Sequence, residues 1–227
     1  MPSFVTEYPQ FFTATNLEWK KLLQPEKYKN IIINSLRFLV QHKRITLFAF
    51  IIMDNHVHLI WQMQPDMDPE AVQRDFLKYT AQRIKNDLEK NHPQVMASFK
   101  VDAKDREYQF WERNALSIEL RTDKVFRQKL NYLHWTPVKA GLCQLPEEYN
   151  YSSALFYETG IDNWGFLTIG IDVINEFECP IPALLVLSLA QKPGATHNKG
   201  GLQFGNTNRG EKVRSNCLSI SVSVKLM

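Results

Sequence analysis

The sequence predicts an α+β fold in which helices pack against an antiparallel sheet. One observation is a pair of short apolar runs, Ile45–Met53 and His56–Gln62, that are rich in β-branched and aromatic residues and flank a two-residue polar break. Such a pair is typical of two strands joined by a tight turn. The other observation is that longer segments with apolar residues at helical spacing lie between runs of this kind.

The first half of the chain supplies strands and two long helices. Phe11–Thr15 has strand composition, and Glu26–His42 follows Pro25, a residue favoured in the first turn of a helix. After the strand pair, Asp68-Pro69-Glu70 opens a second helix over Glu70–Lys90. The expected buried stripe of that helix consists of Val72, Phe76, Thr80, Ile84 and Leu88.

The second half continues the same alternation with shorter elements. Asn91–Gln109 is polar and mixed in charge, so a loop is expected there, and Leu116–Leu120 alternates like a strand. A third helix is expected over Lys124–Trp135, ended by Pro137, because a proline pushes the preceding residue out of the helical region. A short helix around Ser152–Tyr157 completes the pattern.

Composition sets the outer bounds. A net charge of +3 over 227 residues permits a nucleic-acid partner without demanding one. Three widely spaced cysteines without a C-x-x-C pattern favour a reducing cytoplasm over disulfides or a zinc–cysteine site. No signal peptide is expected, and the apolar stretch Ile181–Ala190 is too short to span a bilayer. We expect one functional domain over residues 1–170 and an irregular, disordered tail over residues 171–227.

His56 and His58 are the first candidate site residues. Residues i and i+2 of a strand share a face, roughly 6.6 Å apart, so the two imidazoles are expected to project together beside the turn. Two convergent imidazoles suit a divalent metal ion. The alternative is that the two histidines lie on the surface and have no function, and the apolar sequence around them weighs against it.

A second set of candidates has the composition of a nucleic-acid contact surface. Arg74 and Lys78 lie on the polar face of the second helix, Arg106 lies in the following loop, and Trp111 and Arg113 combine a ring with a guanidinium. This mixture suits stacking on unpaired bases together with phosphate contacts. The alternatives are plain solvation of the helix charges and a core position for the aromatic ring.

Three motifs in one order carry a resemblance to a known family. FIIMDNHVHLIW resembles the histidine–hydrophobe–histidine segment of the HUH single-tyrosine transposases, and LNYLHWTPVKAGL followed by PEEYNYSSALFY resembles the later block of their REP-associated branch. The resemblance covers roughly Tyr8 to Leu167. It implies the ferredoxin-like, RRM-like sheet-and-helix fold of HUH nucleases.

The resemblance also implies a mechanism. In such enzymes a tyrosine attacks a phosphodiester of single-stranded hairpin DNA, forms a 5′-phosphotyrosine and frees a 3′-hydroxyl that later rejoins strands. Tyr132 matches the nucleophile, His56 and His58 match the metal-binding histidines, and the implied cofactor is Mg²⁺ or Mn²⁺. The resemblance also implies that the protein is bacterial and is located in the cytoplasm, in association with the nucleoid. A homodimer is allowed, because some relatives exchange the tyrosine helix between protomers.

Two positions depart from the family pattern. The third metal ligand is usually an amide side chain one helical turn after the nucleophile, and Thr136 stands there in this chain. Asp54 replaces the usual proline before Asn-His, which we expect to be a mild turn substitution. The first departure leaves an alternative open, namely a catalytically impaired or domesticated hairpin-DNA-binding module. A metal-dependent hydrolase unrelated to DNA is disfavoured by the second motif block.

Overall fold

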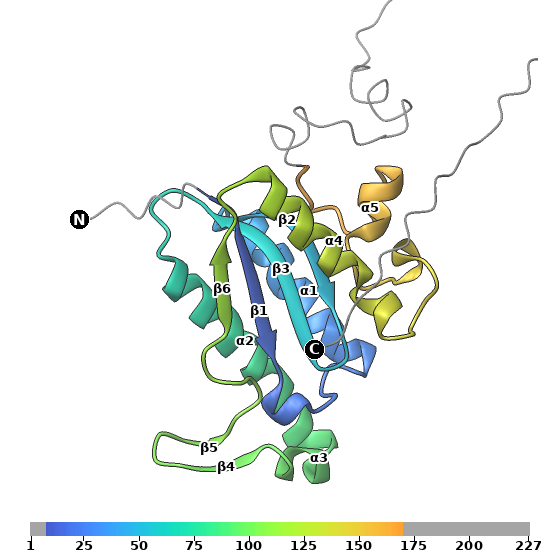
Figure 1. Cartoon of the computed structure of the whole chain (residues 1–227). Coiled ribbons are helices and arrows are strands. Elements are labelled where there is room, and N and C mark those ends of the chain that lie inside the picture. The colour runs from blue at the N-terminus through green and yellow to red at the C-terminus, as the bar shows by residue number, and fades with distance from the viewer. Residues whose placement is uncertain (1–7, 170–227) are drawn as a thin grey trace, which may run out of the picture. The chain divides into compact units, whose positions relative to one another are not determined.

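The computed structural model describes residues 8–169, which form a sheet with helices on both of its faces (Figure 1). The strands are β1 (Gln10–Thr15), β2 (Ile45–Ile52), β3 (His56–Met63), β4 (Lys100–Ala103), β5 (Arg106–Tyr108) and β6 (Leu116–Glu119). The α-helices are α1 (Glu26–Gln41), α2 (Pro69–Asn91), α3 (Pro93–Ala97), α4 (Asp123–Lys139) and α5 (Ala154–Thr159). Two short 3-10 turns, η1 (Leu17–Trp19) and η2 (Pro146–Glu148), complete the described elements.

The main sheet confirms the predicted strands. Its order is β2-β3-β1-β6, and every neighbouring pair is antiparallel. The register pairs Thr13 of β1 with His58 of β3, and Thr15 with His56. Since β3 is an inner strand, flanked by β1 and β2, both histidines lie on an inner strand, at the end of it that leaves the β2–β3 turn.

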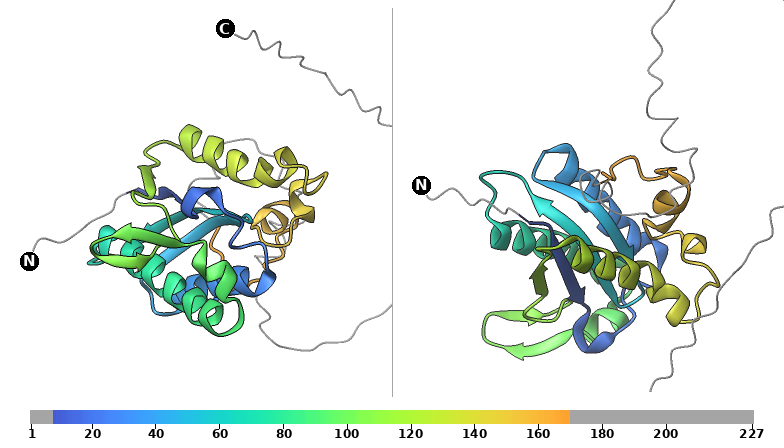
Figure 2. Two further views of the ribbon diagram at one scale, coloured as in Figure 1. Left: turned by 90° about the horizontal axis from the view of Figure 1, so that it is seen from below. Right: turned by 45° about the horizontal axis from the view of Figure 1, so that its top comes forward.

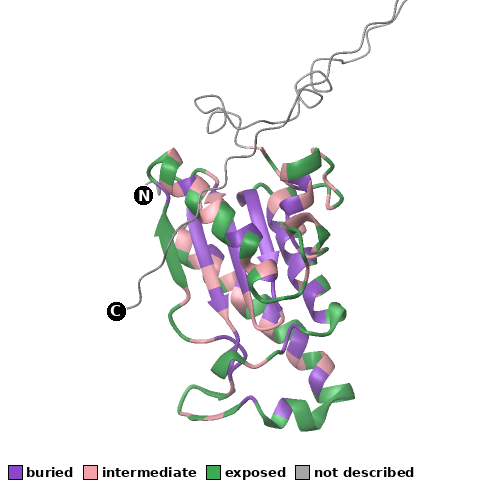
Figure 3. Ribbon diagram, turned by 45° about the vertical axis from the view of Figure 1, so that its right-hand side comes forward, coloured by how far each residue is buried: buried purple, intermediate pink, exposed green. Residues whose placement is uncertain are grey.

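Two apolar layers hold the helices against the sheet. Figure 2 shows α1 and α2 on one face and α4 on the other. Phe12, Leu59 and Trp61 pack on the first face with residues of α1 and α2, whereas Phe11 and Ile60 pack on the second face with Leu133 of α4. Alternate residues of β1 and β3 point to opposite faces of the sheet, so the two faces belong to two separate cores. Figure 3 shows the buried inner strands and the exposed edge strand β6.

Two local predictions were wrong. Asn91–Gln109 is not a loop, because it contains α3, β4 and β5, whose three to five residues are too few to give a clear periodicity. Pro137 does not end the third helix, which continues to Lys139. Its ring is buried, and hydrogen bonds from Ala140 N to Thr136 O and from Leu142 N to Pro137 O carry the chain beyond it.

The predicted tail over residues 171–227 lies outside the described residues and stays a prediction. Between residues 8 and 169, none of the helices combines the length and the apolar character that crossing a membrane requires.

Candidate active site

The turn between β2 and β3 presents the two histidines together. His56 and His58 open β3, and their ring centroids lie 4.7 Å apart on the sheet face that α4 covers. The predicted common face is therefore observed. Whether the pair binds a metal stays a prediction, because within residues 8–169 no cluster of three or more histidine, cysteine or carboxylate side chains could hold one.

Hydrogen bonds fix the orientation of both imidazoles. His58 Nδ1 lies 2.8 Å from Thr13 Oγ1, its cross-strand partner, and His56 Nδ1 lies 2.7 Å from Asn55 Oδ1. In the tautomers in which each Nδ1–H donates, the Nε2 lone pair of each ring is free. His58 Nε2 is fully buried and has no hydrogen-bond partner among the described residues. An orphaned buried nitrogen of this kind suits a ligand to a metal ion.

Burial keeps both histidines neutral. It lowers the pKa of His58 to about 3, with smaller contributions from the charges of His56 and Lys129, and it also lowers the pKa of His56. Neutral imidazole is the form that coordinates metal ions, so no proton has to be displaced at physiological pH. The two free Nε2 atoms could therefore fill two coordination positions of one divalent ion.

Helix α4 brings Tyr132 to the histidines. Its ring centroid lies 5.4 Å from that of His58 and 6.1 Å from that of Phe11, and 46% of the residue is exposed. Leu133, the next residue, is fully buried in the core beneath α4 and anchors the helix at this point. Tyr132 is thus packed along one side and open to solvent on the other, so a polymer substrate can reach the residue.

Two lysines of α4 flank the Tyr132 ring. Lys129 Nζ lies 5.8 Å from the ring centroid, and Lys139 Nζ lies 5.5 Å from it. Lys129 also lies 4.9 Å from the centroid of the Phe11 ring. These ammonium groups attract a phosphate to the position of the phenol. Sequence reasoning missed both lysines, although Lys129 stands one helical turn before Tyr132 and the spacing could have revealed it.

Thr136 occupies the position of the third ligand but is already hydrogen-bonded. Its hydroxyl donates to the carbonyl of Tyr132, with a distance of 2.8 Å between the two oxygens. The hydroxyl proton therefore stays within the helix, and only the oxygen lone pairs are available to a ligand. His134, in contrast, points away from the site: it is buried, and its Nε2 lies 2.9 Å from Ser153 Oγ.

The candidate DNA-contacting residues line one groove of about 890 Å³ between α2 and the segment from Asp105 to Ala115. Arg74, Lys78, Arg106, Trp111 and Arg113 all contribute to it. Arg106 and Arg113 share Asp105 as an ion-pair partner. The DNA role of the four cationic residues stays a prediction.

Trp111 is only 6% exposed, and its Nε1 donates to Thr80 Oγ1 over 3.1 Å. This burial corrects the expectation that its ring stacks on bases. It favours the core alternative, because a ring inside the protein cannot present its face to a base.

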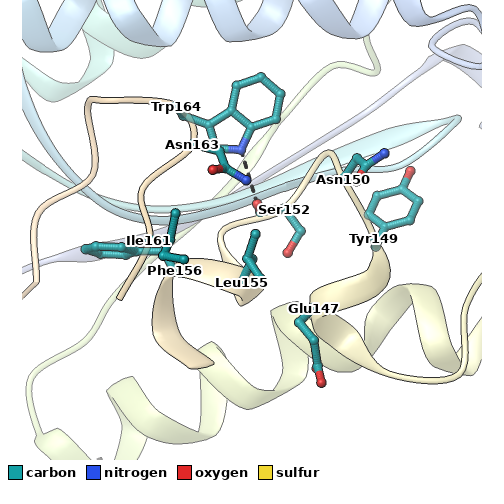
Figure 4. Close-up of a pocket in the computed structure, with 9 residues that line it drawn as sticks. All are labelled: Glu147, Tyr149, Asn150, Ser152, Leu155, Phe156, Ile161, Asn163 and Trp164. Atoms are coloured by element: carbon teal, nitrogen blue, oxygen red, sulfur yellow. Dashed lines mark hydrogen bonds between the residues drawn. The ribbon is translucent and has the colours of Figure 1, made fainter. Parts of the chain in front are cut away.

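A smaller cavity of about 240 Å³ lies near η2 and α5 (Figure 4). Trp164 Nε1 donates to the Ser152 carbonyl over 3.4 Å within it. None of the nine residues that line it is cationic, and Glu147 is among them. The cavity therefore lacks the charge that a phosphate requires.

Comparisons with known proteins all point to transposases. Residues 14–101 match the family described as transposase IS200 like. A REP-associated tyrosine transposase of Haemophilus influenzae is 26% identical over 158 residues, which cover 66% of this chain and 85% of that protein. The resemblance to REP-associated tyrosine transposases is confirmed. The family match includes both histidines but ends before Tyr132, whose role stays a prediction.

A solved structure supports the fold. The structure of a REP-associated tyrosine transposase bound to a REP hairpin has a TM-score of 0.51 and is 16% identical to this chain. The similarity covers 72% of this chain and 87% of that one. At this identity the likeness shows the shared fold alone, and the predicted α+β class is confirmed by it.

Proposed function

We propose that this protein cleaves and rejoins single-stranded DNA at a hairpin, with Tyr132 as the nucleophile. The observation that carries the proposal is the half-exposed Tyr132 ring beside the buried, orphaned Nε2 of His58. The phenol oxygen forms a bond to phosphorus, and the bond to the 3′ oxygen breaks. A 5′-phosphotyrosine and a free 3′-hydroxyl result, and the reverse attack rejoins strands without another energy source.

The chain's own residues divide the work of this reaction. His56 and His58 would hold Mg²⁺ or Mn²⁺, with Thr136 as the third position, and the ion would polarise the scissile phosphate when bound. Thr13 and Asn55 orient the two imidazoles through their Nδ1 atoms. The lysines that flank Tyr132 attract the phosphate toward the phenol.

The partner in this proposal is hairpin DNA. A structurally similar transposase has been solved with a REP hairpin. The groove beside α2 has five cationic and three acidic side chains in its lining, and this basic groove offers the chain a surface for phosphates. Such a substrate would place the protein at the bacterial nucleoid. A homodimer is part of the proposal, and mixing Tyr132→Phe chains with His58→Ala chains tests it, because recovered cleavage would mean that the tyrosine acts on a partner's histidines.

A second candidate function is hairpin binding without cleavage, and Thr136 is the observation that favours it. A hydroxyl already donated to the Tyr132 carbonyl is a weaker ligand than an amide oxygen. Replacing Thr136 with asparagine separates the two functions. A large gain of cleavage would indicate an impaired natural site, and unchanged cleavage would indicate a competent one.

The decisive experiment is a denaturing gel for a covalent protein–DNA adduct. The full chain is incubated with Mn²⁺ or Mg²⁺ and a single-stranded hairpin from the repeats that flank its gene. We expect an adduct with the natural protein and with Tyr79→Phe, which alters an exposed tyrosine of α2, and none with Tyr132→Phe. Hairpin binding without any adduct across several metals would overturn the cleavage proposal in favour of the binding module.

A further inference from the structure

Trp19 is a large, exposed aromatic residue at the edge of the candidate site. It is 62% exposed, the most exposed large apolar residue of the described chain. Its ring lies edge-on to His56, with ring centroids 5.8 Å apart and an interplanar angle of 69°. Phe12 and Trp61, by comparison, are buried in the core. An indole in water beside a candidate metal ligand forgoes burial energy and is available to a binding partner.

The turn that carries Trp19 is held in a costly conformation. Glu18 has φ 55° and Trp19 has φ 57°, so two successive residues with side chains adopt left-handed backbone angles. Residues with side chains seldom adopt these angles, so the surrounding contacts must offset the strain. Strain of this kind concentrates at ligand-binding positions.

Several hydrogen bonds keep the turn in place. Glu18 N donates to Glu112 Oε1 over 2.7 Å, and Trp19 N donates to Asn16 O over 3.0 Å. Asn55 Nδ2 donates to Trp19 O over 3.3 Å, which ties the turn to the residue before His56. The backbone of Trp19 is therefore fixed from both sides before any ligand arrives, so only the side-chain torsions of the indole remain to be ordered on stacking.

The turn also lies between the basic groove and the candidate site at His56. Glu112, which holds Glu18, lines the groove, and the neighbouring Trp111 forms a backbone bridge with Asn16. On its other side the turn meets Asn55 and His56. A strand that leaves a duplex in the groove and runs to Tyr132 would cross this turn.

We propose that Trp19 is a stacking platform for an unpaired base next to the scissile phosphodiester. The inference rests on the proposed function and adds to it a residue that recognises the single-stranded flank of the hairpin. Stacking serves this purpose because every base has a π-face, and the contact positions the strand without reading its sequence. The base would cover the part of the Trp19 indole that is exposed to solvent in the free protein.

The test measures DNA binding in the Tyr132→Phe background, so that cleavage does not enter. Two labelled probes are compared, a hairpin with single-stranded flanks and the same hairpin with blunt ends. We expect Trp19→Ala to weaken binding of the flanked hairpin by about 5- to 150-fold, the range that one base–aromatic stack supplies. Trp19→Phe retains most of the affinity, and neither variant changes binding of the blunt hairpin.

A series of abasic probes locates the stacked base. One flanking nucleotide at a time is replaced by an abasic site. At one position the affinity of the parental protein should fall to that of Trp19→Ala, whereas the affinity of Trp19→Ala should not change at that position. The control is Phe38→Ala, which removes an exposed ring from α1 and should leave both affinities unchanged.

Three outcomes would overturn the proposal. Unchanged binding of the flanked hairpin by Trp19→Ala, or an equal loss on both probes, overturns the stacking role alone. Failure of the parental protein to bind either hairpin overturns the proposed function together with it. Since Trp19 is exposed, its replacement should leave the unfolding midpoint in urea unchanged, which separates a loss of stacking from a loss of fold.

Discussion

The ion pair between Lys29 and Asp54 offers the sharpest test of the packing around the histidine turn. Lys29 Nζ lies 2.8 Å from Asp54 Oδ1, and their side chains are 9% and 22% exposed. Burial lowers the pKa of Lys29, but the hydrogen bond and charge of Asp54, together with Tyr149, outweigh it, so the pKa of Lys29 is raised overall. Asp54 is therefore more than a turn residue, because it neutralises a buried ammonium of α1.

The perturbation is Asp54→Asn, which keeps the shape and removes the charge. At 2.8 Å and an effective dielectric constant of about 20, the gross attraction is about 6 kcal/mol. Breaking a buried pair costs about 3–5 kcal/mol. The amide oxygen still accepts a hydrogen bond and the Tyr149 and Tyr151 rings lie near the ammonium, so we expect a loss of about 2–3 kcal/mol in the free energy of unfolding.

The assay is urea unfolding at pH 7 followed by circular dichroism. Glu119→Gln is the matched control, since it makes the same chemical change in the exposed pair with Arg121, whose side chains are 43% and 73% exposed, and should cost less than about 1 kcal/mol. The double variant Lys29→Met with Asp54→Asn should recover most of the loss, because no buried charge remains. A cost for Asp54→Asn no larger than that for Glu119→Gln would refute the reasoning.

Three further predictions concern single side chains. Burial lowers the pKa of His134 to about 3. Above about pH 6.5 its ring is neutral in both states, and below that pH the unfolded chain binds a proton that the folded chain excludes. As the pH falls below 6.5, this residue should therefore lower the free energy of unfolding by about 1.4 kcal/mol for each pH unit. Urea titrations between pH 6 and 4.5 should give a shallower slope for His134→Gln, and an unchanged slope would contradict the assignment. Thr13→Val removes the oxygen that orients His58, so Mn²⁺ affinity measured by calorimetry should fall about 10- to 100-fold, while Thr13→Ser should retain it. Trp111→Phe should lower the free energy of unfolding by about 1–2 kcal/mol and leave hairpin affinity unchanged. Weaker hairpin binding at unchanged stability would instead restore Trp111 as a stacking residue.

Local patterns were enough to predict the elements that build the site. The period of two places His56 and His58 on one face whatever the rest of the chain does, because it is a property of any extended strand. Asp68, followed by proline and an apolar stripe, marks the start of α2, and its side chain accepts a hydrogen bond from Glu70 N. Such signals depend on neighbours within one helical turn, which the sequence displays directly.

Contacts between distant segments could not be read in the same way. The basic groove joins α2 to residues 105–115, and the pairing of Lys29 with Asp54 joins α1 to the β2–β3 turn. Trp111 illustrates the limit: its composition suited both a base platform and a core anchor, and only its packing against Thr80 separates the two. Pro137 is similar, because a buried position lets a proline remain inside the last turns of α4.

The sequence by itself determined the α+β class, the paired histidines on one face and the resemblance to REP-associated tyrosine transposases, because strand and helix periodicities and motif order are local. Only the tertiary structure decided that Tyr132 meets His58, that Lys129 and Lys139 flank its ring, and that the strained turn at Trp19 adjoins His56. The physical reason is that these relations depend on how α4 and η1 pack on the sheet. Leu133 of α4 is buried with Phe11 in one core and Leu17 of η1 is buried in the other, and each core is assembled from segments far apart in the sequence.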